Sequence, residues 1–297
     1  MTSGRKIFDI HMHFPRNWEK PEDDPTTLVE NLYEKATAAG ITKANFLCGG
    51  RWGISHEDAI KHAQRHPDLW IPTAMIDPET TTPERLVELV DMGYKGLKMI
   101  GVLRDYDCPD YFPMYEKAQE LGLPILLHMG VIGGGIDYAI THPRRDPQAA
   151  ESYNRWASSQ MTQGRNISAT RMRPFHLDTI ANNFPRLKLI GAHLGGTGNY
   201  DEAASVARWR HNVFFDFSGG TTIERHAVER GLIGREIGYE KLIFGSDCSP
   251  DTIAEHINRW DAIFQLLEVP EDCRERMWWL NGAEIYGLET ADWVASK

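Results

Sequence analysis

Four histidines and one aspartate stand where short apolar runs end, and these residue types bind divalent metal ions. His11 and His13 are two residues apart, so on a strand their side chains point to the same side. His128 closes the run PILLH, His193 closes LKLIGAH, and Asp247 closes LIFGSD. Imidazole nitrogen together with carboxylate oxygen suits zinc, manganese or iron. Such an ion lowers the pKa of a bound water to about 7, which provides a nucleophile at neutral pH.

The signal lies in the combination of these residues. One histidine at a strand end is more often a hydrogen-bonded core residue than a ligand. Five ionisable residues at matching positions are hard to explain as packing, because burying ionisable groups without a function is costly. The sequence therefore predicts a metal centre.

The elements that must position these residues alternate along the chain. Runs rich in Ile, Leu, Val and Phe alternate with amphipathic stretches of helical period. The predicted strands are 6–11, 44–48, 70–76, 96–100, 124–128, 187–192, 212–216 and 241–245. Helices with recognisable starts or stops are predicted over 26–39, 56–65, 83–92, 111–121 and 174–184.

Apolar strands that alternate with helices indicate a parallel sheet covered by helices. Eight such units predict an α/β protein with the (β/α)8 TIM-barrel fold, whose active sites lie at the C-terminal ends of the strands. No Gly-x-Gly-x-x-Gly follows the first strand, which counts against a dinucleotide-binding fold. We expect a single domain over 1–297, in which a long insert, 130–186, serves as a lid or substrate wall.

Composition narrows the class of partner. The formal net charge of -10 makes nucleic acid and anionic membranes poor partners, since both favour a basic face. No segment approaches the roughly 18 apolar residues of a membrane span. The four cysteines are far apart and form no CxxC pair, which suits a reducing compartment. We expect a cytoplasmic protein that binds a small molecule, either as a monomer or as a homodimer.

Several segments that contain these residues resemble a known family. DIHMH at 9–13, GLPILLH at 122–128, LKLIGAHLGG at 187–196 and LIFGSD at 242–247 resemble the amidohydrolase superfamily. The segment WLNGAEIYGL at 279–288 is similar to the closing helix of the amidohydrolase-related branch that includes aminocarboxymuconate semialdehyde decarboxylase. The resemblance spans almost the whole chain.

The resemblance implies a role for each of these residues. His11, His13, His128 and Asp247 become the ligands of one divalent ion, usually Zn²⁺, with Mn²⁺ as an alternative. His193 becomes an acid, base or polarising group beside the ion, and Asp247 also takes a proton from water. Phenolic-acid decarboxylases of the family often have Glu in place of the first histidine of the pair, whereas this chain keeps His11.

Four cationic residues are candidates for substrate binding. Lys98 ends the fourth predicted strand, where the wider superfamily uses a carbamylated lysine to bridge two ions. We favour a substrate-binding or structural cation there; in the alternative, His128 and His193 hold a second ion. Arg51 follows the second strand, and Arg171 and Arg173 lie in the insert. The guanidinium fork suits a substrate carboxylate, although a surface ion pair is an equally good interpretation.

Three functions remain open on this basis. The first is a hydrolase that cleaves a small carboxylate-bearing amide, ester or lactone. The second is a decarboxylase or hydratase of an unsaturated or aromatic carboxylic acid on the same site. The third is a degenerate barrel that only binds its ligand, and the intact ligand set argues against it.

Overall fold

Eight short parallel strands form one sheet in the order β1 to β8. The computed structural model describes residues 4–15, 23–50, 54–132 and 166–288. The strands are β1 Phe8–His13, β2 Lys43–Cys48, β3 Trp70–Ile76, β4 Gly96–Met99, β5 Ile125–Leu127, β6 Leu189–Gly191, β7 Val213–Asp216 and β8 Leu242–Ile243. The amide of Ile10 donates to Phe244 O, and the amide of Asp247 donates to His11 O, so the chain after β8 reaches back to β1. The predicted (β/α)8 barrel is confirmed.

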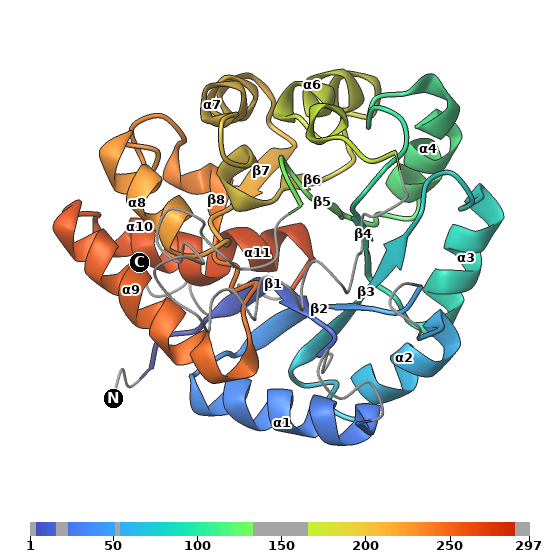
Figure 1. Cartoon of the computed structure of the whole chain (residues 1–297), viewed down its shortest axis with the longest axis horizontal. Helices are drawn as coiled ribbons and strands as arrows, with labels where there is room; N and C mark the ends of the chain where they lie inside the picture. The colour runs from blue at the N-terminus through green and yellow to red at the C-terminus, as the bar shows by residue number, and fades with distance from the viewer. Residues whose placement is uncertain (1–3, 16–22, 51–53, 133–165, 289–297) are drawn as a thin grey trace, which may run out of the picture.

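Helices surround the strands in a ring (Figure 1). The described helices are α1 Pro25–Ala38, α2 His56–Ala63, α3 Pro83–Met92, α4 Phe112–Glu120, α6 Pro174–Asn183, α7 Tyr200–Trp209, α8 Thr221–Glu229, α9 Ile253–Leu266, α10 Glu271–Glu275 and α11 Asn281–Ile285. The five helices predicted from sequence are present within two residues at each end. Ser55 caps α2 by accepting from Asp58 N, and Gly93 ends α3 at φ 112°, a conformation that favours glycine.

The strands are apolar on both faces because each face packs against a different part of the core. Inside the barrel, Ile10, Leu126 and Ile190 belong to one buried cluster. Between the sheet and the helices, Leu97 and Ile125 belong to a second, larger cluster. This two-sided burial explains why the strands appear as continuous apolar runs in the sequence.

The N-terminal end of the barrel is covered by α11, which Figure 1 shows near the middle of the ring. A Cβ atom at Gly282 of α11 would lie 2.6 Å from the ring of Phe8 in β1, so the close contact requires glycine. The candidate metal-binding residues lie at the opposite end, where the strands finish.

The predicted insert is described only in part. Residues 133–165 lie outside the described residues, so its function as a lid stays a prediction. The described end is tied to the barrel, because Met172 O accepts from Gly130 N and Arg171 O accepts from Tyr106 N. Among the described residues, no helix is long and apolar enough to cross a membrane.

Candidate metal centre

The pair His11 and His13 lies at the C-terminal end of β1. Their ring centroids are 5.2 Å apart. His11 is almost fully buried, whereas 24% of the His13 side chain is exposed. Asp9 holds this end of the strand, because its Oδ1 accepts from the amides of His11 and Ser246, each at 3.0 Å. The β1 backbone is thereby fixed against the segment that follows β8.

Asp247 brings a carboxylate to both histidines. Its Oδ1 lies 3.4 Å from His13 Nε2 and 3.7 Å from His11 Nε2. Ligand atoms held at about 2.0–2.2 Å around a tetrahedral ion stand about 3.3–3.6 Å apart, so Oδ1 lies near the spacing from each histidine nitrogen that one shared ion requires. Asp247 has φ 43°, a strained conformation for a non-glycine residue that is typical of functional positions.

His128 and His193 follow β5 and β6 and face each other. His193 Nε2 lies 3.2 Å from His128 Nδ1, and His128 Nε2 lies 3.2 Å from Val131 O. The carbonyl can only accept, so a neutral His128 carries its proton on Nε2 and turns a bare Nδ1 toward His193. The two facing nitrogens are therefore suited to hold a cation between them.

His128 does not join His11, His13 and Asp247 in a single close group. Among the described residues, the groups that bring three possible ligand atoms within 4.8 Å of one another include His11 with His13 and Asp247, and His11 with His193 and Asp216. Three of the four ligands predicted from sequence thus lie together, and the fourth pairs with His193. Whether His128 shares the ion of the first three or holds a second one stays a prediction.

Lys98 projects from β4 into the barrel and is fully buried. Its Nζ lies 3.2 Å from His11 Nε2, the nitrogen that faces Asp247. Burial lowers the pKa of Lys98 to about 8, although Asp216 and Asp247 oppose the shift. The predicted substrate cation therefore stands inside the metal centre and not on the outer rim.

Burial keeps the histidines neutral, which is the form that binds metal. It lowers the pKa of His11 to about 3, with Lys98 adding to the effect, and lowers the pKa of His193 to about 4. Burial raises the pKa of the Asp247 carboxyl to about 7, against the opposing charge of Lys98. A carboxylate with a pKa in this range can both take up and return a proton near neutral pH.

Two further site residues, Asp216 and Ser218, were missed in the sequence. Asp216 ends β7 fully buried, and its Oδ2 lies 2.8 Å from His11 Nδ1. Ser218 Oγ lies 2.9 Å from His193 Nδ1. Both occur in FFDFS with the same two-residue spacing as the histidine pair, and that spacing after a predicted strand was the available signal.

The three predicted arginines are placed differently. Arg51 lies outside the described residues. Arg171 donates to Asn166 O, and its charge helps to lower the pKa of Glu79 beside Arg104. Arg173 forms an ion pair with Glu202 of α7, and 46% of its side chain is exposed. Neither described arginine contacts the histidine cluster, and their role in substrate binding stays a prediction.

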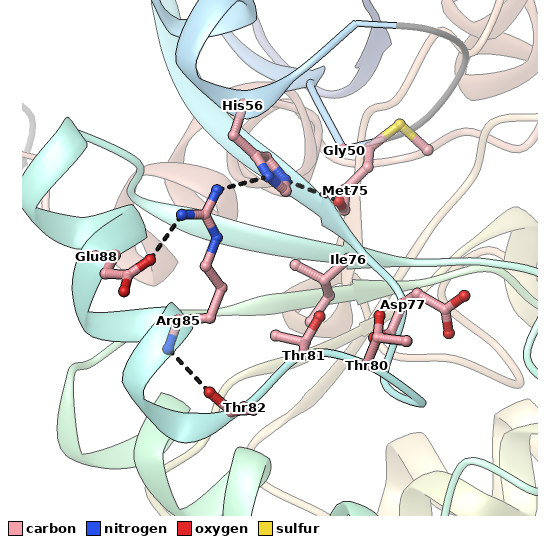
Figure 2. Close-up of a pocket in the computed structure, with 10 residues that line it drawn as sticks. All are labelled: Gly50, His56, Met75, Ile76, Asp77, Thr80, Thr81, Thr82, Arg85 and Glu88. Atoms are coloured by element: carbon pink, nitrogen blue, oxygen red, sulfur yellow. Dashed lines mark hydrogen bonds and ion pairs between the residues drawn. The ribbon is translucent and has the colours of Figure 1, made fainter.

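A cavity of about 370 Å³ lies between the end of β3 and the starts of α2 and α3 (Figure 2). It is lined by Gly50, His56, Met75, Ile76, Asp77, Thr80, Thr81, Thr82, Arg85 and Glu88. Arg85 already pairs with Glu57 and Glu88, each at 2.7 Å, so its charge is balanced. None of the candidate metal ligands lines this cavity.

Comparison with known proteins identifies the family. A family model described as amidohydrolase matches residues 8–288. The chain belongs to the amidohydrolase family. The resemblance seen in the sequence is thereby confirmed, and so is the expectation that the protein is an enzyme, because the named relatives of this amidohydrolase are decarboxylases and hydrolases.

Three relatives illustrate the range of the family. A γ-resorcylate decarboxylase from Polaromonas sp. is 22% identical over 72% of this chain and 68% of its own. A probable 2-pyrone-4,6-dicarboxylic acid hydrolase from Acinetobacter baumannii, solved with citric acid, has a TM-score of 0.62 at 15% identity, covering 95% of this chain and 99% of its own. A 5-carboxyvanillate decarboxylase from Novosphingobium aromaticivorans, solved with manganese, has a TM-score of 0.63 at 12% identity, covering 97% and 98%. At such identities the structures show the shared fold.

Proposed function

We propose that this amidohydrolase is a metal-dependent hydrolase of a small carboxylate-bearing amide, ester or lactone. The observation that carries the proposal is that the two oxygens of the Asp247 carboxylate face different histidines. Its Oδ1 faces His11 and His13, while its Oδ2 lies 3.8 Å from His193 Nε2. One carboxylate thus connects the candidate ligand pair to a second proton-carrying group, as hydrolysis requires.

In the proposed site, His11, His13, His128 and Asp247 hold one divalent ion, Zn²⁺ or Mn²⁺. When bound, such an ion polarises a carbonyl oxygen and makes a neighbouring water more acidic. Asp247 removes a proton from the attacking water as the new C–O bond forms. The bond to the leaving nitrogen or oxygen then breaks, and Asp247 passes the proton to the leaving atom, directly or by way of His193 Nε2.

We also propose that the substrate carries a carboxylate. Lys98 is a buried cation within the centre, 3.2 Å from His11 Nε2, and a substrate carboxylate would add a negative partner to Asp216 and Asp247. Arg51, Arg171 and Arg173 are the proposed second set of substrate contacts, because the guanidinium fork matches a carboxylate. The predicted substrate is a cyclic or unsaturated acid or its derivative.

Decarboxylation is the second candidate function. The curated relative is named a γ-resorcylate decarboxylase, and a solved neighbour is named a 5-carboxyvanillate decarboxylase. In that reaction the C–C bond to the carboxylate breaks, carbon dioxide leaves, and Asp247 or His193 donates a proton to the carbon. A hydratase would use the same groups to add water to a double bond.

One experiment separates these functions. The metal-loaded protein is incubated with lactones of cyclic dicarboxylic acids and, separately, with hydroxybenzoates, while acid release and carbon dioxide are both measured. We expect acid release without carbon dioxide, lost on chelation and restored by Zn²⁺ or Mn²⁺. Carbon dioxide release would make the protein a lyase. Turnover that a chelator does not affect would overturn the metal-dependent mechanism.

A further inference from the structure

We infer that Asp216 and Ser218 are positioning residues that set the tautomers of His11 and His193, so that both histidines present a bare Nε2 to the metal centre. The inference rests on the proposed metal site and adds two residues to it. It starts from the hydrogen bonds that Asp216 accepts. Its Oδ1 accepts from the amides of His193 and Ser218 at 2.8 and 3.0 Å and from Ser218 Oγ at 2.6 Å.

His11 is held by the other oxygen of the same carboxylate. Asp216 Oδ2 lies 2.8 Å from His11 Nδ1. A carboxylate only accepts, so the shared proton stands on Nδ1 and leaves Nε2 with a lone pair. The contact on the opposite side of the ring requires the same tautomer, because the charged Lys98 Nζ, 3.2 Å from Nε2, can only donate. His11 therefore has a single tautomer, the one whose Nε2 can bind an ion with His13 and Asp247.

Ser218 transmits the same constraint to His193. Its hydroxyl has one proton, which the 2.6 Å contact commits to Asp216 Oδ1. Ser218 Oγ must then accept from His193 Nδ1 at 2.9 Å, so His193 also carries its proton on Nδ1. One buried carboxylate thereby orients two histidines that come from β1 and from the segment after β6.

The variant Asp216→Asn tests the first link without a change of shape. The asparagine oxygen must still accept the two backbone amides, so its NH₂ group turns to His11 Nδ1. His11 would then move its proton to Nε2 and block the lone pair, as an Asp→Asn change does beside other catalytic histidines. We expect a loss of about 10–100-fold in Zn²⁺ affinity, measured by competition with a chromogenic chelator.

A matched control separates the tautomer from the loss of a buried charge. Asp9→Asn also removes a buried carboxylate at this end of β1, but Asp9 contacts the backbone of His11 and not its ring. The asparagine oxygen still accepts from the amides of His11 and Ser246, so we expect its Zn²⁺ affinity to change by less than the roughly tenfold lower end expected for a contact to a ligand's ring. Equal losses in the Asp216→Asn and Asp9→Asn variants would overturn the inference.

The tautomers are also observable directly. Imidazole ¹⁵N NMR of the metal-free protein distinguishes a protonated from a bare ring nitrogen. We expect His11 and His193 to be protonated on Nδ1 in the native protein, His11 to switch in Asp216→Asn, and His193 to become mixed in Ser218→Ala. A native protein that binds no Zn²⁺ would contradict the proposed function, whereas a native protein that binds Zn²⁺ with either ring protonated on Nε2 would overturn the inference alone. If Asp216→Asn fails to fold, the NMR measurement on Ser218→Ala still tests the inference.

Discussion

At the scale of the residue, neighbouring groups decide which atoms of the centre can donate or accept a proton. His11 lies between Asp216 and Lys98, and Asp247 divides its two oxygens between His13 and His193. Burial lowers the pKa of the histidines and raises that of Asp247. The same buried position therefore favours neutral ligands and a carboxylate that can exchange a proton near neutral pH.

His193→Ala separates acid–base chemistry from metal binding. We expect the variant to keep its Zn²⁺ and to lose activity by about 10²-fold or more, the usual scale for a positioned proton-transfer group. In His11→Ala, metal content and turnover should fall together. Elemental analysis and turnover on the same samples measure both. Loss of an ion from His193→Ala would instead assign His193 as a ligand together with His128.

The charge of the substrate can be tested at the arginines. Replacing the arginine that binds the carboxylate should raise KM far more for the acid than for its neutral ester or amide. Arg51→Ala, Arg171→Ala and Arg173→Ala form the test set. Arg208→Ala is the control, because Arg208 is exposed on α7 and lies 3.7 Å from Glu236. If none of the test set differs from the control, the arginines are surface charges.

At the scale of the element, ion pairs hold neighbouring helices around the barrel. Glu224 of α8 is nearly buried against α9, where its Oε1 lies 3.1 Å from His256 Nδ1 and 2.9 Å from Arg259 Nε. Burial by itself would raise the pKa of Glu224, but the hydrogen bonds from His256 and Arg259 outweigh it and lower the pKa. This contact joins the helices that follow β7 and β8, next to the segments that contain Ser218 and Asp247.

Glu224→Gln should destabilise the fold by about 2–3 kcal/mol at pH 7, because it removes the buried carboxylate that pairs with Arg259 and leaves that guanidinium only the exposed Glu255. A carboxyl group whose folded pKa is lowered stabilises the protein above its unfolded pKa of about 4.5. That contribution disappears as the pH falls through the lower folded value. Urea unfolding at pH 7 and below pH 4.5 should therefore show the native and variant stabilities converging in acid.

The exposed Glu229 on the same helix is the control for this measurement. It lies 3.9 Å from Arg225, and 59% of its side chain is exposed. Glu229→Gln should change stability by less than about 0.5 kcal/mol at either pH, as is usual for surface ion pairs. If Glu224→Gln lowers the free energy of unfolding no more than Glu229→Gln does, the buried contact does not stabilise the protein.

At the scale of the whole molecule, most of the buried side chains are apolar and the candidate metal centre occupies only the strand ends. The apolar clusters inside the barrel and beneath the helices are large and are built from side chains that do not depend on an ion. The barrel thus has its main stabilisation, the burial of apolar surface, without an ion. The candidate centre lies at the C-terminal ends of the strands, where polar groups do not disrupt the packing between strands.

Removal of the ion should therefore lower stability without unfolding the protein. A ligand at 100 times its Kd stabilises the native state by about 2.7 kcal/mol, which corresponds to a Tm shift of about 5 °C for a chain of this size. Far-UV circular dichroism should be unchanged by a chelator at 25 °C, while the Tm falls and recovers with added Zn²⁺. Loss of helical signal on chelation would mean that the folded state itself requires the ion.

The amino-acid sequence by itself determined the eight strands, the barrel and the order of the histidines and Asp247, because apolar period and two-residue spacing are local properties of the chain. Only the tertiary structure decided that His128 faces His193, that Lys98 points at His11, and that Asp216 from β7 bonds to a ring from β1. Those contacts join residues up to 205 positions apart. They depend on how strand ends meet across the barrel, and hydrophobic periodicity carries no information about which polar side chains meet there.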